Sequence, residues 1–255
     1  MKFNTIHPTI HPTALVHPGA QIGKNVSIGA YSVVGAYVWI GDDTKIGSHV
    51  MIDGKTYIGK ANQIMCFCAI GVVPQDLKYK HEGMTYIGNG NFIREYVSIH
   101  RATKGVTYIG NENLLMAYTH IAHDCQISDH VILVNGVNLG GHVRIGRYAV
   151  IGGLTGLHQF VEIGRLSMIA GMSRIDRDVP PYMIAEGNPA RLRGINLVGL
   201  TRRKVEEAHK SALKKMWMKM KKREGIEGIE KINDDYVRQV QRFIKKSERG
   251  VVELE

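Results

Sequence analysis

The sequence predicts a mainly β protein, a parallel β-helix of six-residue repeats followed by a small C-terminal α-helical domain. An aliphatic residue falls at every sixth position from Ile10 to Ile70, from Ile87 to Ile99 and from Ile109 to Ile175. These stretches hold 11, 3 and 12 such positions, which makes 26 hexads. A period of six is neither helical nor that of an ordinary strand. It is typical of a β-helix, whose units bury their apolar faces only by stacking on one another.

The other positions of the hexad agree with this fold. Small, β-branched or short polar residues such as Val26, Thr44 and Cys68 stand four residues after the aliphatic, where they suit a narrow interior. Glycine follows the aliphatic directly in 13 of the 26 hexads, and we expect it to supply positive φ at a corner. Three strands make a coil of 18 residues, so residues 18 apart should lie one above the other, in eight to nine coils.

The repeat is interrupted twice and then ends. Eleven extra residues enter between Ile70 and Ile87 and four between Ile99 and Ile109, and insertions in a solenoid project as loops that often carry binding. Helical spacing starts near Thr201, the expected N-cap, and returns over 232–244, with Gly250 as the expected stop. We therefore predict a β-helix domain over 1–190 and a helical domain over 191–255.

Charge is concentrated at the C-terminal end. Residues 190–255 hold 18 Lys and Arg against 10 Asp and Glu, a net of +8 out of +10 for the chain. This surface is either simply solvated or a docking face for an acidic protein, a nucleotide or a membrane. The sequence has no RNA-binding aromatic motif and no zinc finger, so no nucleic-acid partner is expected.

Three further features of the sequence bear on the cellular compartment of the protein. No apolar run approaches the roughly 18 residues of a membrane span, so no stable membrane insertion is expected. The polar N-terminus is not that of a signal peptide. Three cysteines, two of them on inward positions, fit a reduced compartment. We expect a cytoplasmic protein.

Candidate catalytic residues come from histidines in the later coils. They are His100, His120, His123, His142 and His158. By the 18-residue rule, His123, Gly141 and Gln159 form one vertical ladder, and Asp124 and His142 begin the next. A histidine beside a carboxylate can act as a general base, and the backbone N–H of Gly141 could stabilise an oxyanion. A zinc site of His120, His123 and His142 is the competing interpretation.

Several strings together resemble one family, as these segments show: HIAHDC at 120–125, GGHVRIG at 140–146, GLHQFVEIG at 156–164, DVPPY at 178–182, EGNPARLRGINLVGL at 186–200, PQDLKYK at 74–80 and SIHR at 98–101. The sequence resembles the acyl-[acyl-carrier-protein]–UDP-N-acetylglucosamine O-acyltransferases, the first enzymes of lipid A synthesis. The resemblance implies a left-handed β-helix and a homotrimer with active sites between subunits.

The resemblance also implies a mechanism. His123 would take the proton from the sugar 3-hydroxyl, which attacks the thioester of a 3-hydroxyacyl chain carried on the phosphopantetheine of acyl carrier protein. Asp124 would support the base, and the N–H of Gly141 would stabilise the tetrahedral oxyanion. No cofactor, metal or covalent enzyme intermediate is implied.

By the same resemblance, UDP-N-acetylglucosamine and the donor would meet side chains that line the site: Asp76, Lys78, His120, His142, His158 and Gln159. Asn196, Arg202 and Arg203 would hold the nucleotide or its phosphates, and Gly171 would leave the acyl groove open for a longer chain. Three positions depart from the family's pattern. Val198 replaces a common glutamate, and Tyr118 and Thr119 are expected to reshape the sugar pocket.

Other classes of protein stay open at this point. One is a trimeric zinc hydratase of the γ-carbonic-anhydrase type, and another is an N-acyltransferase, including one that acts on a 3-amino UDP-sugar. Only nine residues precede the first hexad, which counts against an N-acyltransferase with an N-terminal uridine-binding domain. A purely structural solenoid would not explain the histidine ladders.

Overall fold

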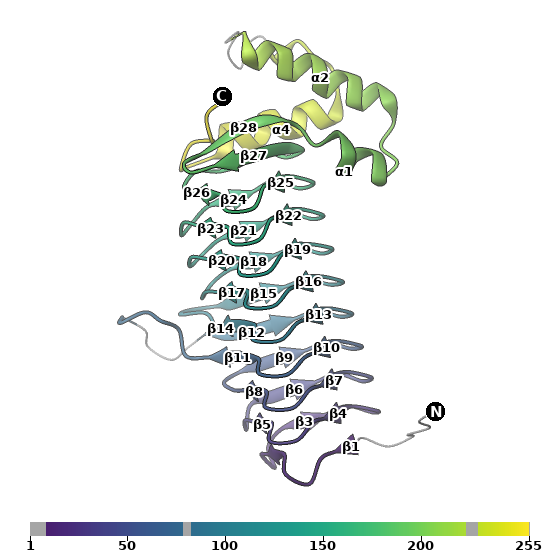
Figure 1. Cartoon of the computed structure of the whole chain (residues 1–255), viewed down its shortest axis with the longest axis vertical. Coiled ribbons are helices and arrows are strands. Elements are labelled where there is room, and N and C mark those ends of the chain that lie inside the picture. Colours follow the sequence, from purple (N-terminus) through teal and green to yellow (C-terminus); the bar gives the residue numbers. More distant parts are fainter. Residues whose placement is uncertain (1–8, 79–82, 223–228, 255) are drawn as a thin grey trace.

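The computed structural model, which describes residues 9–78, 83–222 and 229–254, is a three-sided parallel β-helix with helices at its C-terminal end (Figure 1). We call its sheets faces A, B and C; they contain 11, 9 and 8 strands. Every one of the 26 repeat aliphatics lies in its own strand, from β1 to β26. The predicted register holds, since His120 pairs with Asn138 and Gln126 with Arg144.

The strands of face A, in spatial order, are β1 (Thr9–Ile10), β4 (Ser27–Ile28), β7 (Lys45–Ile46), β10 (Gln63–Ile64), β13 (Phe92–Ile93), β16 (Leu114–Leu115), β19 (Ile132–Leu133), β22 (Val150–Ile151), β25 (Met168–Ile169), β27 (Met183–Gly187) and β28 (Ala190–Ile195). Those of face B are β2 (Leu15–Val16), β5 (Val33–Val34), β8 (Met51–Ile52), β11 (Ala69–Val72), β14 (Ser98–His100), β17 (His120–Ile121), β20 (Asn138–Leu139), β23 (Gly156–Leu157) and β26 (Arg174–Ile175). Those of face C, from the C-terminal end, are β24 (Glu162–Ile163), β21 (Arg144–Ile145), β18 (Gln126–Ile127), β15 (Val106–Ile109), β12 (Met84–Ile87), β9 (Thr56–Ile58), β6 (Val38–Ile40) and β3 (Gln21–Ile22).

The core is the stack of repeat aliphatics inside the triangle. Ile52, Ile70 and Ile99 have no exposed surface, and Thr44 and Cys68 are buried beside them as the pattern predicts. Full burial of one such aliphatic contributes about 1.5–3 kcal/mol. The stack is therefore the main source of stability, and it fixes the height of each corner along the β-helix.

The expectation that the repeat glycines supply positive φ holds for Gly71, with a φ of +70°, and is wrong for the others. Positive φ falls two residues later, on non-glycine residues such as Asn25 and Asp43. Glycine is needed for close approach instead, because a Cβ on Gly29 would lie 2.6 Å from the carbonyl carbon of Gly47 on the next coil. The left-handed position carries a full side chain at most corners, with Gly54, Gly90 and Gly136 as exceptions, and this is where Asp124 and His142 stand.

The β-helix extends further than the expected eight to nine coils. β27 pairs in parallel with β25 although the hexad pattern has ended, and β28 turns back to pair antiparallel with β27. The predicted boundary at 190 falls at the start of β28, and the division into 1–190 and 191–255 stays a prediction. Pattern recognition stops at Ile175 because neither β27 nor β28 repeats the six-residue spacing.

The helices that follow in the described residues are α1 (Leu197–Arg202), α2 (Glu207–Lys221) and α4 (Asp235–Lys246). The prediction that Thr201 is an N-cap is wrong, since α1 is capped by Asn196, whose side chain accepts a hydrogen bond from the Gly199 N–H. Gly250 does not end α4, which stops at Lys246; its φ of +73° serves a later turn. Within the described ranges, no helix is both long and apolar enough to cross a membrane.

Beyond α4, the C-terminal arm, residues 247–254, returns to the last coils. Val251 bridges to Asp178, and Ser247 Oγ donates to Asp178 Oδ2 at 2.6 Å. The guanidinium of Arg249 donates twice to the carbonyl oxygen of Asp176, at 3.1 and 3.3 Å. The arm therefore places Arg249 against the same coils that carry the candidate site.

Candidate active site

The candidate base and its carboxylate stand at the corner between β17 of face B and β18 of face C. His123 Nδ1 lies 2.7 Å from Asp124 Oδ2, and both side chains are mostly buried. Because the ionised carboxylate only accepts hydrogen bonds, the proton belongs on Nδ1, which leaves the lone pair on Nε2. The pair has the geometry of an oriented general base.

Asp124 is held by the second, four-residue insertion. Thr103 donates to Asp124 Oδ2 from its hydroxyl at 2.7 Å and from its backbone N–H at 3.1 Å. The Asp124 backbone N–H donates to Thr107 Oγ1 at 2.8 Å. Burial alone would raise the pKa of Asp124, but hydrogen bonds from His123 and Thr103 outweigh it and keep that pKa below its usual range. The carboxylate therefore stays ionised beside the base.

Gly141 lies one coil further along the same ladder. A Cβ there would lie 2.6 Å from Cε1 and 2.8 Å from Nε2 of His123, so the imidazole rests against the bare backbone. Among the described residues, the Gly141 N–H finds no hydrogen-bond acceptor. It is a free donor beside the reactive nitrogen of His123, which suits a developing oxyanion.

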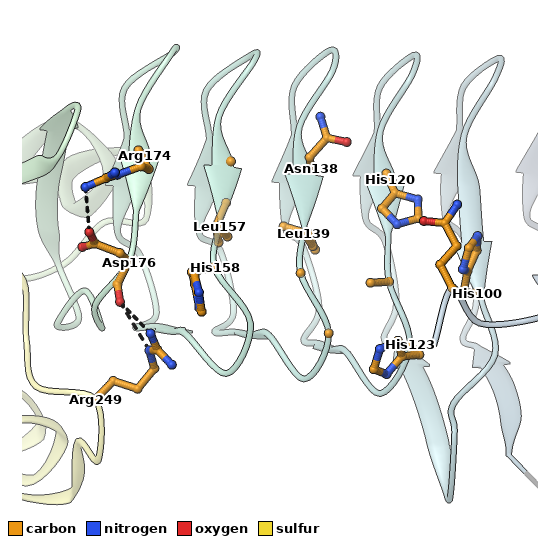
Figure 2. Close-up of a pocket in the computed structure, with 15 residues that line it drawn as sticks. His100, His120, His123, Asn138, Leu139, Leu157, His158, Arg174, Asp176 and Arg249 are labelled. Atoms are coloured by element: carbon orange, nitrogen blue, oxygen red, sulfur yellow. Dashed lines mark hydrogen bonds and ion pairs between the residues drawn. The ribbon is translucent and has the colours of Figure 1, made fainter. Parts of the chain in front are cut away.

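A cavity of about 780 Å³ opens on face B in front of this corner (Figure 2). Its lining residues are Gln75, His100, His120, Ala122, His123, Asn138, Leu139, Gly140, Gly141, Gly156, Leu157, His158, Arg174, Asp176 and Arg249. Four of the five predicted histidines thus share one cavity. The fifth, His142, lies on the other side of the corner, where its ring stacks on Phe160 at 4.5 Å and its Nε2 lies 3.7 Å from Asp124 Oδ2.

Two of the cavity histidines, His100 and His120, have pKa values below the ordinary range, which favours their neutral form. Burial, with His120 and His123 adding to it, lowers the pKa of His100 to about 4. Burial and the neighbouring His123 also lower the pKa of His120, whose Nδ1 lies 2.8 Å from Ser98 Oγ. Neutral imidazoles offer both a donor and an acceptor, which suits the hydroxyl groups of a sugar.

A second cavity of about 920 Å³ opens on face C, across the same corner. It is lined by Lys104, Val106, Asp124, Gln126, His142, Arg144, Phe160, Glu162, Asp178, Lys246, Glu248 and Arg249. Asp124 and His142 therefore belong to its wall, and Arg249 lines both cavities. The catalytic corner stands between two recesses of different chemistry.

Several residues of the site escaped sequence reasoning, among them Gln75, Thr103 and Arg249. Gln75 comes from the first insertion and Thr103 from the second, so both loops do carry site residues as solenoid insertions often do. Arg249 comes from the C-terminal arm, far from His123 in sequence. The interruptions of the repeat could have pointed to the two loop residues. Arg249 lies outside the repeat, so no periodicity points to it.

Other predicted site residues lie away from the face-B cavity within this single chain. Asp76 and Lys78 are in the first insertion, where the Lys78 N–H donates to Asp76 Oδ1 at 2.8 Å. Gln159 is exposed next to His158 but does not line the cavity. Gly171 follows β25, at the corner between faces A and B. These four positions are not brought to His123 by one subunit.

The predicted nucleotide residues lie at a third corner, between faces C and A. Asn196 is engaged as the cap of α1 and donates from Nδ2 to the Leu166 carbonyl at 2.8 Å. Arg202 ends α1, and the Arg203 guanidinium sits 4.0 Å from the ring centroid of Tyr148. Val198 is 62% exposed on the same helix.

Two further sequence expectations need correction. Tyr118 and Thr119 do not line the face-B cavity: Tyr118 is exposed at the A–B corner, and Thr119 is buried with its hydroxyl bonded to the Met116 carbonyl. The proposed zinc trio of His120, His123 and His142 does not converge. In the described part of the chain, the three potential ligands that meet are His123, Asp124 and His142, and the first two are already bonded to each other.

Comparisons with known proteins define the class first. Residues 19–54 match the family described as bacterial transferase hexapeptide (six repeats), and residues 178–252 match the second domain of UDP-N-acetylglucosamine O-acyltransferase. A hexapeptide β-helix with a His–Asp pair beside a free backbone N–H is thus a hexapeptide-repeat transferase. The predicted left-handed β-helix with C-terminal helices is confirmed.

Sequence identity to individual relatives shows which family of hexapeptide-repeat transferases this is. The chain is 52% identical over 213 residues to an acyl-[acyl-carrier-protein]–UDP-N-acetylglucosamine O-acyltransferase of Synechocystis, covering 82% of this chain and 77% of the relative. A Helicobacter pylori protein of the same name is 42% identical, covering 78% and 77%. The structure of UDP-N-acetylglucosamine O-acyltransferase from Moraxella catarrhalis matches with a TM-score of 0.92 at 40% identity, covering 96% and 99%. The chain belongs to the family of acyl-[acyl-carrier-protein]–UDP-N-acetylglucosamine O-acyltransferases.

Proposed function

We propose that this chain transfers a 3-hydroxyacyl group from acyl carrier protein to the 3-hydroxyl of UDP-N-acetylglucosamine, the first step of lipid A biosynthesis. Its family membership and the His123–Asp124–Gly141 arrangement support this reaction. The observation that carries the proposal is the bond between His123 Nδ1 and Asp124 Oδ2, with the opposite ring edge against the Gly141 backbone.

The proton transfers follow from the geometry of these groups. The sugar hydroxyl gives its proton to His123 Nε2 as its oxygen attacks the thioester carbonyl. The imidazolium that forms is stabilised by Asp124, and the oxyanion accepts a hydrogen bond from the Gly141 N–H. Collapse of the tetrahedral intermediate breaks the carbon–sulfur bond, and the proton on His123 passes to the leaving thiolate. This route uses no cofactor or metal, and the acyl donor arrives on the phosphopantetheine of its carrier.

The proposed homotrimer is supported by an aromatic ridge along the A–B corner: Tyr31, His49, Phe67, Tyr96 and Tyr118. Successive rings are stacked with centroids 4.8–5.2 Å apart. The tyrosine and phenylalanine residues of the ridge are 45–62% exposed. Leu154 and Met172 continue the same corner at 68% and 75% exposure. Apolar patches of this length are rare on monomers, and further copies of the chain would cover this one.

Threefold symmetry about that ridge would also complete the active site. Each subunit would turn face A toward one neighbour and face B toward the other. The C–A corner with Arg202 and Arg203 would then meet the neighbour's B–C corner with His123, at the level of His142, since Tyr148 and His142 share a coil. Guanidinium forks suit the phosphates of a nucleotide. This arrangement accounts for predicted residues that one chain leaves apart.

The acyl chain has a wall of matching chemistry in the same arrangement. The outward row of face A is apolar in the later coils, where it consists of Phe92, Leu114, Ile132, Val150 and Met168. In the trimer this row would stand opposite the neighbour's face-B cavity. We infer that it lines the groove for the acyl chain and that the enzyme works in the cytoplasm, where acyl carrier protein supplies the donor.

The test is product analysis with a mixed pool of 3-hydroxyacyl carrier proteins and UDP-N-acetylglucosamine. Mass spectrometry should show an O-acylated sugar nucleotide. His123→Ala should lower turnover by at least about 10²-fold, because an oriented general base contributes 10²–10⁴-fold, while trimer and melting temperature hold. A folded His123→Ala variant with near-normal turnover would exclude His123 as the base. If product formed only with a 3-amino analogue of the sugar nucleotide, the acceptor would be the 3-amino group and not the 3-hydroxyl.

A further inference from the structure

The face-C cavity gathers four cationic side chains beside the catalytic corner: Lys104, Arg144, Lys246 and Arg249. They come from the second insertion, β21, the end of α4 and the C-terminal arm. Four separate segments thus contribute cations to one recess that touches Asp124 and His142. None of these four cations has a role in the proposed mechanism.

Cations close to the cluster have carboxylate partners, whereas in the described part of the chain those of the cluster have none. Lys245, next to Lys246, pairs with Glu230, and Arg174 pairs with Asp176 at 3.1 Å. Within the described ranges, no carboxylate lies within ion-pair distance of Lys104, Arg144 or Lys246. Their heads remain available to an anion that enters the cavity.

The carboxylates of the cavity do not cancel this charge. Asp124 is bonded to His123 and Thr103, and Asp178 accepts from the Glu162 N–H at 2.7 Å and from Ser247 Oγ at 2.6 Å. That leaves Glu162 and Glu248 against four cations. Burial and the neighbouring Asp178 raise the pKa of Glu162, and nearby Arg144 and Lys246 oppose that rise.

The position of the cluster favours the donor over the sugar nucleotide. The reactive Nε2 of His123 lies against Gly141 on the face-B side, so the acceptor hydroxyl must enter from face B. In the proposed trimer, faces A and B meet neighbours, while face C stays open to solvent. A large protein-borne donor can reach the corner only from such an open side. The thioester would then arrive across the corner from the sugar.

We propose that Lys104, Arg144 and Lys246, with Arg249 at the edge, form a binding site for the phosphate of the phosphopantetheine arm. This inference rests on the proposed function and adds a donor-side subsite to it. A phosphodiester carries its charge on two free oxygens, which guanidinium and ammonium groups bind with charge-assisted hydrogen bonds. The site therefore anchors the arm so that its thioester end reaches His123 and Gly141.

The experiment compares two small donors that differ by one phosphate: 3-hydroxyacyl phosphopantetheine and 3-hydroxyacyl pantetheine. The wild type should use the phosphorylated donor with a kcat/KM at least about tenfold higher. Arg144→Ala and Lys246→Ala should each reduce that preference about fivefold, in line with one partly exposed charge contact. The KM for UDP-N-acetylglucosamine should not change. Lys245→Ala is the matched control at the neighbouring position of α4.

A variant that should raise the phosphate preference controls for general damage to the fold, because such damage would not raise it. Glu162→Gln removes the competing carboxylate and keeps the backbone bond to Asp178, so it should raise the preference for the phosphorylated donor two- to threefold, roughly the value of a weak charge contact. Arg249 is left unchanged because its guanidinium also holds the Asp176 carbonyl.

The outcomes separate this inference from the proposed function. If the wild type forms no ester from 3-hydroxyacyl carrier protein, the proposed function is wrong. If it does, but Arg144→Ala and Lys246→Ala leave the phosphate preference unchanged, the donor subsite is wrong. A rise in the KM for UDP-N-acetylglucosamine alone would assign the cations to the nucleotide and equally overturn the donor subsite.

Discussion

The imidazole of His123 rests against the bare backbone of Gly141 on the next coil, where a Cβ atom would lie 2.6 Å from Cε1. The ring cannot move away freely, because its Nδ1 is bonded to Asp124 at 2.7 Å. Glycine is therefore required at 141 by the base itself. The same residue supplies the free N–H, so one position serves both the base and the oxyanion.

Gly141→Ala should consequently disable the site without unfolding the β-helix. The methyl group would push the His123 ring out of line with Asp124, and we expect turnover to fall by about 10²-fold, the lower range for loss of a positioned base. Steady-state kinetics and thermal melting measure the two effects. Gly194→Ala, where a Cβ meets nothing within 4 Å, is the control. Normal turnover in Gly141→Ala would show that the ring adapts.

The second prediction concerns Thr103, which holds the catalytic carboxylate. Thr103→Val removes the hydroxyl that donates to Asp124 Oδ2 at 2.7 Å. A hydrogen bond to a charged group contributes about 1.5–3 kcal/mol, so kcat should fall about tenfold while the KM values hold. The pKa of Asp124 should rise toward its usual value, and the acidic limb of the pH–rate profile should move to higher pH. Thr119→Val, another buried threonine without contact to the pair, should leave the profile unchanged.

The repeat predicted the fold and the histidine ladders because both follow from local periodicity. Six-residue spacing fixes which side chains point inward, and stacking at 18 residues places His123 under Gly141. It could not place Thr103, Gln75 or Arg249, since insertions and the C-terminal arm obey no period. It also misassigned the glycines, because close approach between coils and positive φ leave the same sequence signal.

The third prediction is a pH dependence of stability that originates at His100. Its pKa is about 4 in the folded chain against an ordinary value of 6.5, so the unfolded state binds more protons between these values. Its contribution is fully present above pH 6.5 and is lost as the pH falls toward 4. At pH 5 the loss should be about 2 kcal/mol per subunit.

Melting temperatures at pH 7.5 and 5.0 check this effect. His100→Gln stays neutral throughout and should lose less stability between the two pH values than the wild type. His130→Gln, a histidine outside both cavities, serves as the control. An equal loss in wild type and His100→Gln would assign the acid sensitivity to other groups, of which His120 is the nearest with a lowered pKa.

The fourth prediction tests the aromatic ridge as the trimer axis. Tyr96→Asp should place three carboxylates close together at the axis, in place of stacked rings, and so dissociate the assembly and abolish turnover. Light scattering after size exclusion measures the mass. Tyr57→Asp on face C interrupts a similar stack, with Tyr86 at 5.0 Å, on a face that the trimer leaves open. It should stay trimeric. If both variants keep the mass of the wild type, the ridge is not the interface.

The last prediction concerns acyl length and Gly171, at the A–B corner beside Met168 of the apolar row. Glycine leaves the groove open, so the wild type should prefer a longer 3-hydroxyacyl chain, of about the fourteen-carbon class, since each buried methylene contributes about 0.8 kcal/mol, or roughly fourfold in rate. Gly171→Met should block the groove and favour shorter donors. Because a Cβ at 171 would lie 3.2 Å from the Gly153 carbonyl oxygen, Gly171→Ala is needed as the control for backbone strain alone. Competition between ten- and fourteen-carbon donors measures the preference in all three proteins. A wild type that already prefers the ten-carbon donor would mean that another residue closes the groove.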